Sequence, residues 1–351
     1  MFPLRTIRTM PGSHVVPTKL LSNQFDHFYK GGDRIGKLRK GPGGPMRPEE
    51  WIGSTTTRFG QELTGLSYLT EGELLRDSIE ADPIAWLGAE HVGAFGSSTE
   101  ILVKLLDLDQ RLPVHYHPDQ KFAAERLHIN HGKTEAWIIL EAPQGAKVGL
   151  GFNREMSKSE IANLVAAHDS QALLESLVFT EVSSGDAIFV PAGVPHAIES
   201  GIFVLELQEP SDLSILLEWN DFAVDGDIDG HLDLGFDSAL DALRLTPLSA
   251  PEKVQAFTRF EQGEPVGHAI FNSVADPFFR ADYLAGNGER VDAGFGIFLC
   301  LWRAGTLQYE GSAPMPVDVG DAVVIPHIAG DYVLNGASGV LCRPPVPQRS
   351  S

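Results

Sequence analysis

The chain has 351 residues, and its 27 lysines and arginines against 47 aspartates and glutamates give a formal net charge of −20. This excess of carboxylates argues against a nucleic-acid-binding protein, because phosphate neutralisation requires a basic face, and against docking on anionic lipid. The length predicts two domains, and the 36 glycines and 23 prolines favour turns and short strands over long helices.

Two features of the sequence bear on the cellular compartment. The two cysteines, Cys300 and Cys342, are too few for a disulfide-stapled secreted scaffold. Residues 1–14 contain no apolar core of a signal peptide, and the longest apolar stretches, such as Phe295–Trp302, are too short to span a bilayer. We therefore expect a cytoplasmic protein without a membrane segment.

Residues 1–99 are predicted to form a loop-rich segment that packs on the rest of the protein. This segment contains a short predicted strand at Trp51–Thr57 and two short predicted helices, Gly72–Ala81 and Asp82–Leu87. Asp82 followed by Pro83 is typical of a helix start, because the carboxylate caps the first turn and proline suits its first position.

From residue 100 the pattern of apolar residues changes to that of strands, which predicts a first β-domain over residues 100–222. Its strands are expected at 101–106, 112–116, 134–140, 147–152, 178–182, 187–190, 197–198 and 202–208. A helical insert is predicted over 157–177, with Ser157 as N-cap and Glu160 three residues later. A linker, acidic and glycine-rich at 225–235 and with one short helix, follows over 223–250.

An internal echo predicts a second β-domain over residues 251–351. The segment Gly185-Asp-Ala-Ile-Phe-Val-Pro191 returns as Gly320-Asp-Ala-Val-Val-Ile-Pro326. A glycine, an aspartate, an apolar strand and a proline are a common sequence pattern at edge strands, so the repeat could be accidental. Each copy, however, lies in its own strand-rich half, which favours two related β-domains. The second copy is followed by Asp331 where the first is followed by His196, so this domain is expected to be degenerate and to lack a metal site.

Four residues form a candidate metal site in the first β-domain. His115 and His117 alternate along a predicted strand, so their imidazoles point the same way. Glu135 lies near the start of the next strand, and His196 follows a Pro-x-Gly turn that would place it at the mouth of a barrel. Three imidazoles and one carboxylate suit Zn²⁺, Mn²⁺, Fe²⁺ or Ni²⁺. Ordinary polar strand residues are the alternative interpretation, which the spacing disfavours.

Several motifs then resemble a known family. The pattern Gly-x5-Pro-x-Gly-x2-His over 185–196 is the second cupin motif. Segments 113–119, 132–137 and 185–197 resemble the Ser-Val-Gln-x-His-Pro-Asp, Gly-Lys-Thr-Glu-x-Trp and Gly-Asp-x5-Pro-Ala-Gly-x2-His-Ala motifs of type I mannose-6-phosphate isomerases. Segments 100–107 and 206–212 match the strands that precede and follow these motifs. The chain is therefore similar to that family of the cupin superfamily through most of its length.

The resemblance implies a mainly β fold of two cupin (jelly-roll) β-barrels with a few short helices, the second barrel degenerate. It implies a metal-dependent aldose–ketose isomerase that interconverts mannose 6-phosphate and fructose 6-phosphate, so the partner is a small-molecule sugar or sugar phosphate. His115, His117, Glu135 and His196 correspond to the ligands of one divalent metal ion, and we expect Zn²⁺. The family has glutamine at position 115, so histidine here keeps a ligand.

The family's proton-transfer residues correspond to Glu206 and Lys133. If Glu199-Ser-Gly201 forms a hairpin turn, His196 faces about Val204, and Glu206 lies two residues further along the same face. His128 and His131 are expected to be loop residues near the site rather than ligands.

One departure from the family concerns the substrate. The family carries an active-site arginine where this chain has Leu216, and a phosphate requires arginine, lysine or a helix N-terminus. The basic residues at 34, 37, 39 and 40 could replace it. Three alternatives stay open: an isomerase of a non-phosphorylated sugar, a metal-dependent oxygenase and a non-catalytic sugar-binding cupin.

Overall fold

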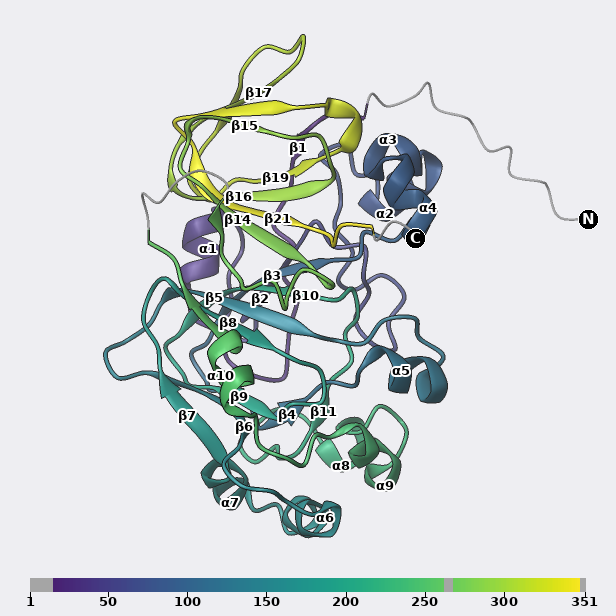
Figure 1. The fold of residues 1–351 in the computed structure, drawn as a ribbon, viewed down its shortest axis with the longest axis vertical. Helices are drawn as coiled ribbons and strands as arrows, with labels where there is room; N and C mark the ends of the chain where they lie inside the picture. Colours follow the sequence, from purple (N-terminus) through teal and green to yellow (C-terminus); the bar gives the residue numbers. More distant parts are fainter. Residues whose placement is uncertain (1–14, 262–267, 348–351) are drawn as a thin grey trace, which may run out of the picture.

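The computed structural model describes residues 15–261 and 268–347. Most of its regular structure consists of strands in four antiparallel sheets, which confirms the predicted mainly β class. Figure 1 shows these sheets stacked along the long axis of the molecule, with the C-terminal strands at one end and the central strands at the other. None of the sheets closes into a barrel within the described ranges.

Residues 49–216, called the first half below, form two sheets that face each other, with one further strand from residues 257–259. The six-stranded sheet has the order β12 (Phe257–Arg259), β8 (Asp186–Val190), β5 (Glu135–Glu141), β10 (Phe203–Gln208), β3 (Leu102–Asp107) and β2 (Glu49–Ile52). The five-stranded sheet has the order β11 (Ile215–Leu216), β4 (His115–Tyr116), β9 (His196–Ile198), β6 (Lys147–Phe152) and β7 (Leu177–Glu181). Apolar side chains from both sheets, among them Ile139, Val148 and Ile198, are buried together between them.

The second half repeats this arrangement. Its six-stranded sheet has the order β1 (Thr18–Lys19), β19 (Ala322–Ile325), β16 (Gly296–Arg303), β21 (Ser338–Arg343), β14 (Arg280–Leu284) and β13 (His268–Ala269). The facing sheet has the order β15 (Asn287–Val291), β20 (Tyr332–Asn335), β17 (Gly305–Tyr309) and β18 (Met315–Val317). A separate apolar core that includes Phe298, Leu307 and Leu334 lies between them.

The internal echo of the sequence lies at equivalent places in the two six-stranded sheets. Gly185 and Gly320 precede β8 and β19, and each adopts a φ of +92°, which glycine allows at no steric cost. β8 pairs with β5 and β19 pairs with β16, so the repeated segment has the same neighbour in both halves. The edge strands are exchanged, however. β1 from the N-terminal segment extends the second sheet, and β12 from the C-terminal half extends the first.

The two six-stranded sheets also pack against each other, so they form the middle layers of the stack. Leu105, Leu207 and Ile138 from one sheet share a core with Ile297 and Val340 from the other. A buried ion pair reinforces this contact, because Arg39 Nε lies 2.7 Å from Glu50 Oε1 with both side chains at most 3% exposed. Arg39 also donates hydrogen bonds to the backbone carbonyls of Leu20 and Gly320.

The helices are short and lie in connections. They are α1 (Arg34–Arg39), α2 (Leu75–Ala81), α3 (Pro83–Leu87), α4 (Ala89–Phe95), α5 (Gln120–Phe122), α6 (Lys158–Ala166), α7 (Ser170–Glu175), α8 (Gly226–Asp229), α9 (Phe236–Ala239) and α10 (Ala250–Ala256), with tighter or wider turns at Ala123–Leu127, Leu240–Ala242 and His327–Ala329. The predicted caps are confirmed, since Asp82 accepts from Ala85 N and Ser157 accepts from Glu160 N, each at 3.1 Å.

Some predicted boundaries are wrong. The strand expected at 112–116 is paired only at His115–Tyr116, and the strand expected at 51–57 is shifted to Glu49–Ile52. Pairing partners rather than local pattern set both ends. No helix in the described part of the chain is long and apolar enough to cross a membrane.

The buried Arg39–Glu50 pair yields a stability prediction. Arg39→Met leaves the Glu50 carboxylate buried without its counter-charge, so the free energy of unfolding should fall by about 3–5 kcal/mol. Urea unfolding followed by circular dichroism measures this change. The matched control is Lys37→Met on the same helix, whose ion pair with Asp33 is exposed. Its effect should stay below about 1 kcal/mol, and an equal effect of both variants would contradict the assigned role of the buried pair.

Candidate active site

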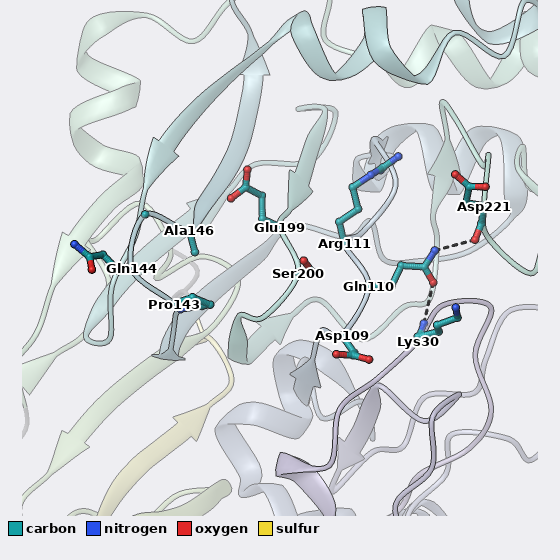
Figure 2. A pocket seen from close by; sticks show the side chains of 11 residues that line it. Lys30, Asp109, Gln110, Arg111, Pro143, Gln144, Ala146, Glu199, Ser200 and Asp221 are labelled. Atoms are coloured by element: carbon teal, nitrogen blue, oxygen red, sulfur yellow. Dashed lines mark hydrogen bonds between the residues drawn. The ribbon is translucent and has the colours of Figure 1, made fainter.

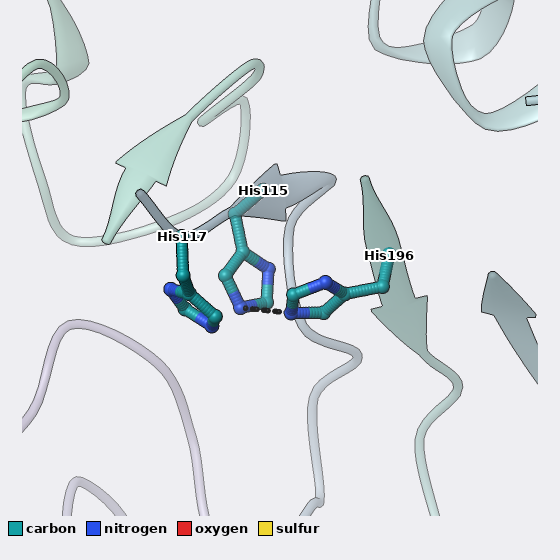
Figure 3. Close-up of side chains that lie close together, drawn as sticks. All are labelled: His115, His117 and His196. Carbon is teal, nitrogen blue, oxygen red and sulfur yellow. Dashed lines mark hydrogen bonds between the residues drawn. The ribbon is translucent and has the colours of Figure 1, made fainter. Parts of the chain in front are cut away.

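Three histidines meet at one end of the first pair of sheets. β4 and β9 are neighbours, and their pairing places His115 directly opposite His196, while His117 follows β4. One ring nitrogen from each histidine lies within 4.8 Å of the others, and all three side chains are buried. Figure 3 shows the three rings converging on one point.

Backbone carbonyls orient all three rings. His115 Nδ1 lies 2.8 Å from the Pro113 carbonyl, His117 Nδ1 lies 2.7 Å from the Leu213 carbonyl, and His196 Nδ1 lies 2.9 Å from the Val194 carbonyl. Because a carbonyl only accepts hydrogen bonds, Nδ1 carries the proton in each neutral ring and Nε2 carries a lone pair. The lone pairs that metals bind are therefore the ones that face each other.

Glu135 approaches this group from the facing sheet, where it begins β5. Its Oε2 lies 3.0 Å from His117 Nε2, and its Oε1 lies 3.3 Å from His196 Nε2. The indole Nε1 of Trp137, two residues along the same strand, donates to Glu135 Oε1 at 3.0 Å and fixes the carboxylate. The structure thus brings together the four residues that the sequence proposed as ligands.

Burial sets the charge of these groups. It lowers the pKa of His117 and of His196 to about 3, and it lowers the pKa of His115 well below its usual value. Burial alone would raise the pKa of Glu135, but the neighbouring His117, Lys133 and His196 outweigh it, and the pKa falls well below its ordinary value. The group at neutral pH is three neutral imidazoles and one carboxylate, the protonation state that metal binding requires.

The donor set fits a divalent metal. His115 Nε2 and His196 Nε2 lie 3.0 Å apart, and two lone pairs at that distance repel each other unless a cation lies between them. His117 Nε2 is buried, and the Glu135 carboxylate that lies 3.0 Å away offers it no proton, so a cation would suit both groups. Three imidazole nitrogens and a carboxylate match the ligand chemistry of Zn²⁺, although Mn²⁺, Fe²⁺ and Ni²⁺ accept the same donors.

A cavity of about 660 Å³ opens beside this group and contains both predicted catalytic residues. Glu206 lies on β10, where its neighbours across the sheet are Lys104 on β3 and Trp137 on β5. Lys133 immediately precedes β5, and its Nζ lies 3.4 Å from Glu135 Oε2. Glu206, Lys133 and Glu135 therefore share one cavity wall, and His115 also lines the cavity.

Glu206 is the unusual carboxyl of the cavity. It is only 4% exposed, and its Oε1 has no hydrogen-bond partner. Burial and the nearby Glu135 charge raise the pKa of Glu206 to about 8. Such a group can take up and release a proton near neutral pH.

The predicted route by which Glu206 reaches the site is wrong. β9 pairs with β4 and β6, and β10 pairs with β3 and β5, so the 199–201 turn connects two sheets rather than a hairpin. Glu206 nevertheless lies close to the histidine group, because it lines the same cavity as His115 and Glu135 and responds to the charge of Glu135.

Lys104 is a site residue that sequence reasoning did not assign. It is 3% exposed, its Nζ lies 3.3 Å from Glu49 Oε2 and 3.9 Å from Asp212 Oδ1, and it stands 4.4 Å from the centre of the Trp51 ring. Surrounding carboxylates outweigh burial and raise its pKa, so it remains a cation. The sequence did contain a sign of this role, a lysine in the middle of the apolar run 101–106. A charge buried in such a strand needs a partner of opposite charge.

The remaining candidate residues lie outside this group. His128 is exposed, and His131 pairs with Glu100 at 2.9 Å. The basic residues of 34–40 do not line the cavity, since Arg34 pairs with Asp107 and Arg39 with Glu50. The apolar side chain of Leu216, in contrast, does line it.

A second, more open hollow of about 760 Å³ contains no predicted site residue. Figure 2 shows its polar side chains, of which Gln110 bridges the backbone N–H of Lys30 and the backbone carbonyl of Asp221. The glutamine is therefore engaged in holding two loops together.

Comparison with known proteins links the chain to one group of enzymes. It is 39% identical over 134 residues to the mannose-6-phosphate isomerase of Streptococcus mutans serotype c, which covers 37% of this chain and 41% of that protein. It is 34% identical over 122 residues to the mannose-6-phosphate isomerase ManA of Bacillus subtilis strain 168, which covers 35% of this chain and 38% of that protein. The matched segments thus span about two fifths of these curated relatives. No family model matches the chain.

Solved structures extend the likeness to the whole fold. The structure of the mannose 6-phosphate isomerase from Bacillus subtilis has a TM-score of 0.71 at 22% identity, with 93% of this chain and 99% of that chain covered. The chain resembles the mannose-6-phosphate isomerases and shares their fold. A phosphomannose isomerase variant from Salmonella typhimurium gives the same TM-score at 17% identity, with 94% of this chain and 100% of that chain covered.

The first prediction from this site concerns metal content. After a chelator has removed any bound metal, the protein should bind about one Zn²⁺ or Co²⁺ per chain in calorimetry. His196→Gln should weaken that binding at least about tenfold, because one of the converging nitrogens is lost. The matched control is His128→Asn, since His128 is exposed at a φ of +58° that asparagine tolerates. Unchanged binding in His196→Gln would refute the ligand assignment.

The second prediction concerns acid stability of the metal-free protein. The unfolded chain binds protons at histidines near pH 6.5, whereas folded His117 and His196 resist them until about pH 3. The free energy of unfolding should therefore fall as the pH is lowered from 6.5 to 3. His196→Gln should make this slope shallower by up to about 1.4 kcal/mol per pH unit. Urea titrations at several pH values measure the slopes, and identical slopes would contradict the burial of a neutral His196.

Proposed function

We propose that the protein is a metal-dependent aldose–ketose sugar isomerase of the mannose-6-phosphate isomerase type. The observation that carries this proposal is the buried carboxyl of Glu206, with an unpartnered oxygen and a pKa of about 8, in the same cavity as a histidine–glutamate group suited to a metal. An isomerase of this class needs a group that moves one proton between two adjacent carbons and a positive charge that stabilises the oxygens bonded to those carbons.

His115, His117, Glu135 and His196 would hold one divalent metal ion, and Zn²⁺ suits these donors best. When bound, the ion would supply positive charge for the oxygens at C1 and C2 of the sugar. The backbone carbonyls behind the three histidines hold the rings in place, so the site needs little rearrangement when a ligand enters.

Glu206 would remove a proton from one sugar carbon and return it to the neighbouring carbon. Lys133 would assist as a cation beside the reacting oxygens, since it lies at the cavity wall next to Glu135. Lys104 would keep its charge while held by Glu49 and would stabilise the ionised form of Glu206, its neighbour across the sheet, which accepts the proton. The six-stranded sheet thereby positions both proposed proton-transfer groups, Glu206 on β10 and Lys133 directly before β5.

The two pairs of sheets support a division of the chain into a loop-rich segment 1–99, a metal-binding cupin domain 100–222 with an insert at 157–177, a linker 223–250 and a degenerate cupin domain 251–351. In the second pair, Asp331 holds the position in the repeated segment that His196 holds in the first, and it forms an ion pair with Arg290 of β15 next to β20. We assign that half a structural role, because it offers no equivalent set of nitrogen ligands at these strands.

Isomerisation of a non-phosphorylated sugar is the second candidate, and the apolar Leu216 in the cavity wall favours it. An oxygenase and a non-catalytic sugar-binding protein use comparable ligands but would give no sugar interconversion. The names of the relatives make mannose 6-phosphate and fructose 6-phosphate the first pair to assay, together with free mannose, fructose and lyxose, on metal-loaded and chelated protein.

The decisive variant is Glu206→Gln. It should lower kcat about 10²- to 10⁴-fold, because the proton-transfer group is lost, while the metal content stays unchanged. Incorporation of solvent deuterium at the sugar carbon should fall with it. Glu141→Gln, an exposed glutamate at the end of β5, is the control and should keep full activity. Full activity in Glu206→Gln would refute the assigned base, and metal-dependent oxygen uptake without isomerisation would refute the proposed reaction.

A further inference from the structure

The cavity extends along the six-stranded sheet, from the histidine–glutamate group towards residues 23–28. Its floor carries one ionisable side chain from each of four neighbouring strands, Glu135 on β5, Glu206 on β10, Lys104 on β3 and Glu49 on β2. The segment 23–27 continues this order beyond β2, since Trp51 N donates to the Asn23 carbonyl at 3.1 Å. Neighbouring strands lie about 4.8 Å apart, so about 14 Å separates β10 from this segment. An extended six-carbon sugar with a phosphate on its last carbon fits such a length.

His27 lies at the far end of this floor and has a nitrogen without a partner. Its side chain is only 6% exposed, lines the cavity, and packs against the ring of Phe25 with 4.7 Å between the centroids. Its Nδ1 lies 3.5 Å from Glu49 Oε1, which only accepts protons, whereas its buried Nε2 has no hydrogen-bond partner. Burial lowers the pKa of His27, so the ring is neutral and Nε2 carries a lone pair. A sugar hydroxyl is a donor that this lone pair can accept.

Arg58 stands beside His27 and has donors to spare. Its guanidinium donates to the backbone carbonyl of Asp26 at 3.1 Å, and it forms no ion pair with a carboxylate within the described ranges. Its charge reaches the His27 ring, whose pKa it helps to lower. The other two cations of the cavity are already engaged, Lys104 with Glu49 and Lys133 with Glu135. Arg58 is therefore the cavity cation whose charge is free for a ligand.

The loop that carries Arg58 is tied to the cavity wall. Arg58 N donates to the Thr64 carbonyl at 2.8 Å, which closes the loop, and Phe59 N donates to Asp212 Oδ2 at 3.1 Å, which anchors it. Asp212 also lines the cavity, so the anchor holds the loop at the cavity rather than away from it.

The nearby Glu49 carboxylate does not oppose an anion at this end, because it is already compensated. Its Oε1 accepts from Tyr29 Oη at 2.6 Å, and its Oε2 accepts from Trp51 Nε1 at 2.8 Å and lies 3.3 Å from Lys104 Nζ. The exposed aspartates of 225–233 belong to a segment that was predicted to be a linker. That segment lies against β11 of the facing sheet, where Leu216 N donates to the Gly230 carbonyl at 2.8 Å.

We infer that Arg58 binds the phosphate of the substrate at the end of the cavity remote from the histidine–glutamate group, and that His27 Nε2 accepts a hydrogen bond from a hydroxyl of the sugar between the two ends. A guanidinium presents two parallel N–H groups that match two phosphate oxygens. This inference rests on the proposed sugar isomerase, because it places the reacting carbons beside Glu206 and the histidine–glutamate group.

Calorimetry on the Zn²⁺-loaded protein with mannose 6-phosphate and with mannose tests the role of Arg58. Arg58→Gln should weaken binding of mannose 6-phosphate at least about tenfold and change binding of mannose less than about threefold, because the contact is with the phosphate alone. Arg58→Lys keeps the charge without the paired N–H groups and should restore part of the affinity. Equal weakening of both sugars by Arg58→Gln, or no binding of mannose 6-phosphate to the natural chain, would overturn the inference.

The matched control is Arg47→Gln, which removes the same charge beside the same residue. Arg47 Nε lies 2.9 Å from Asp26 Oδ1, but Arg47 does not line the cavity. Both affinities should stay within about twofold of those of the natural chain, because an exposed charge outside the cavity is screened by solvent. A loss of mannose 6-phosphate affinity as large as that of Arg58→Gln would reduce the role of Arg58 to general charge and overturn its assignment.

His27→Asn tests the hydroxyl contact. Asparagine keeps a nitrogen at the place of Nδ1, facing Glu49, and removes Nε2. Affinity for mannose and for mannose 6-phosphate should fall by the same factor, at least about threefold, because the hydroxyl is common to both sugars. Thermal unfolding verifies that the variant is folded, and unchanged affinities in the folded variant would refute the contact.

Activity measurements separate this inference from the proposed function. In an active isomerase, Arg58→Gln should raise KM for mannose 6-phosphate at least about tenfold with kcat little changed, since the phosphate does not react. An unchanged KM would refute the inference and leave the isomerase intact. Binding of mannose 6-phosphate that depends on Arg58, without turnover of any sugar, would support the inference and refute the isomerase.

Discussion

Three hydrogen bonds from imidazole Nδ1–H groups to backbone carbonyls fix the geometry on which the rest of the site depends. They select one tautomer in each ring and leave three Nε2 lone pairs directed at one point. Lone pairs this close repel each other and destabilise the folded protein in the absence of a cation. A bound metal ion would remove this repulsion. Glu135 then completes the group from the opposite sheet, and the spacing of the two sheets therefore determines the size of the site.

The same inner face gives two glutamates opposite properties. Glu135 lies among imidazoles and Lys133, and it stays ionised. Glu206 lies on the neighbouring strand, opposite Trp137 and thus two residues along from Glu135, and its pKa is raised. Lys104 limits this effect from the neighbouring strand. One residue type thus supplies both an ionised carboxylate suited to a metal and a carboxyl suited to proton transfer, because each strand places its side chain in a different electrostatic environment.

Local signals in the sequence were sufficient to predict which four side chains converge and where two helices start. The alternation of His115 and His117, the turn before His196 and the caps Asp82 and Ser157 depend on a few neighbouring residues. The connection between β9 and β10 was predicted wrongly, because its two strands belong to different sheets and no local pattern reports that. Asp225, Asp229 and Asp233 also line the cavity and were missed for the same reason, since a contact with β11 holds their segment there.

The exchange of edge strands makes the two halves mutually dependent. Thr18–Lys19 completes a sheet whose other strands lie between residues 268 and 343, and Phe257–Arg259 completes a sheet whose other strands lie between residues 49 and 208. If the linker were cut, each fragment would retain the strand that covers the other fragment's exposed sheet edge, and such edges invite aggregation. The halves are therefore not interchangeable modules, and any shuffling of one half, in evolution or in engineering, would have to carry its borrowed strand along.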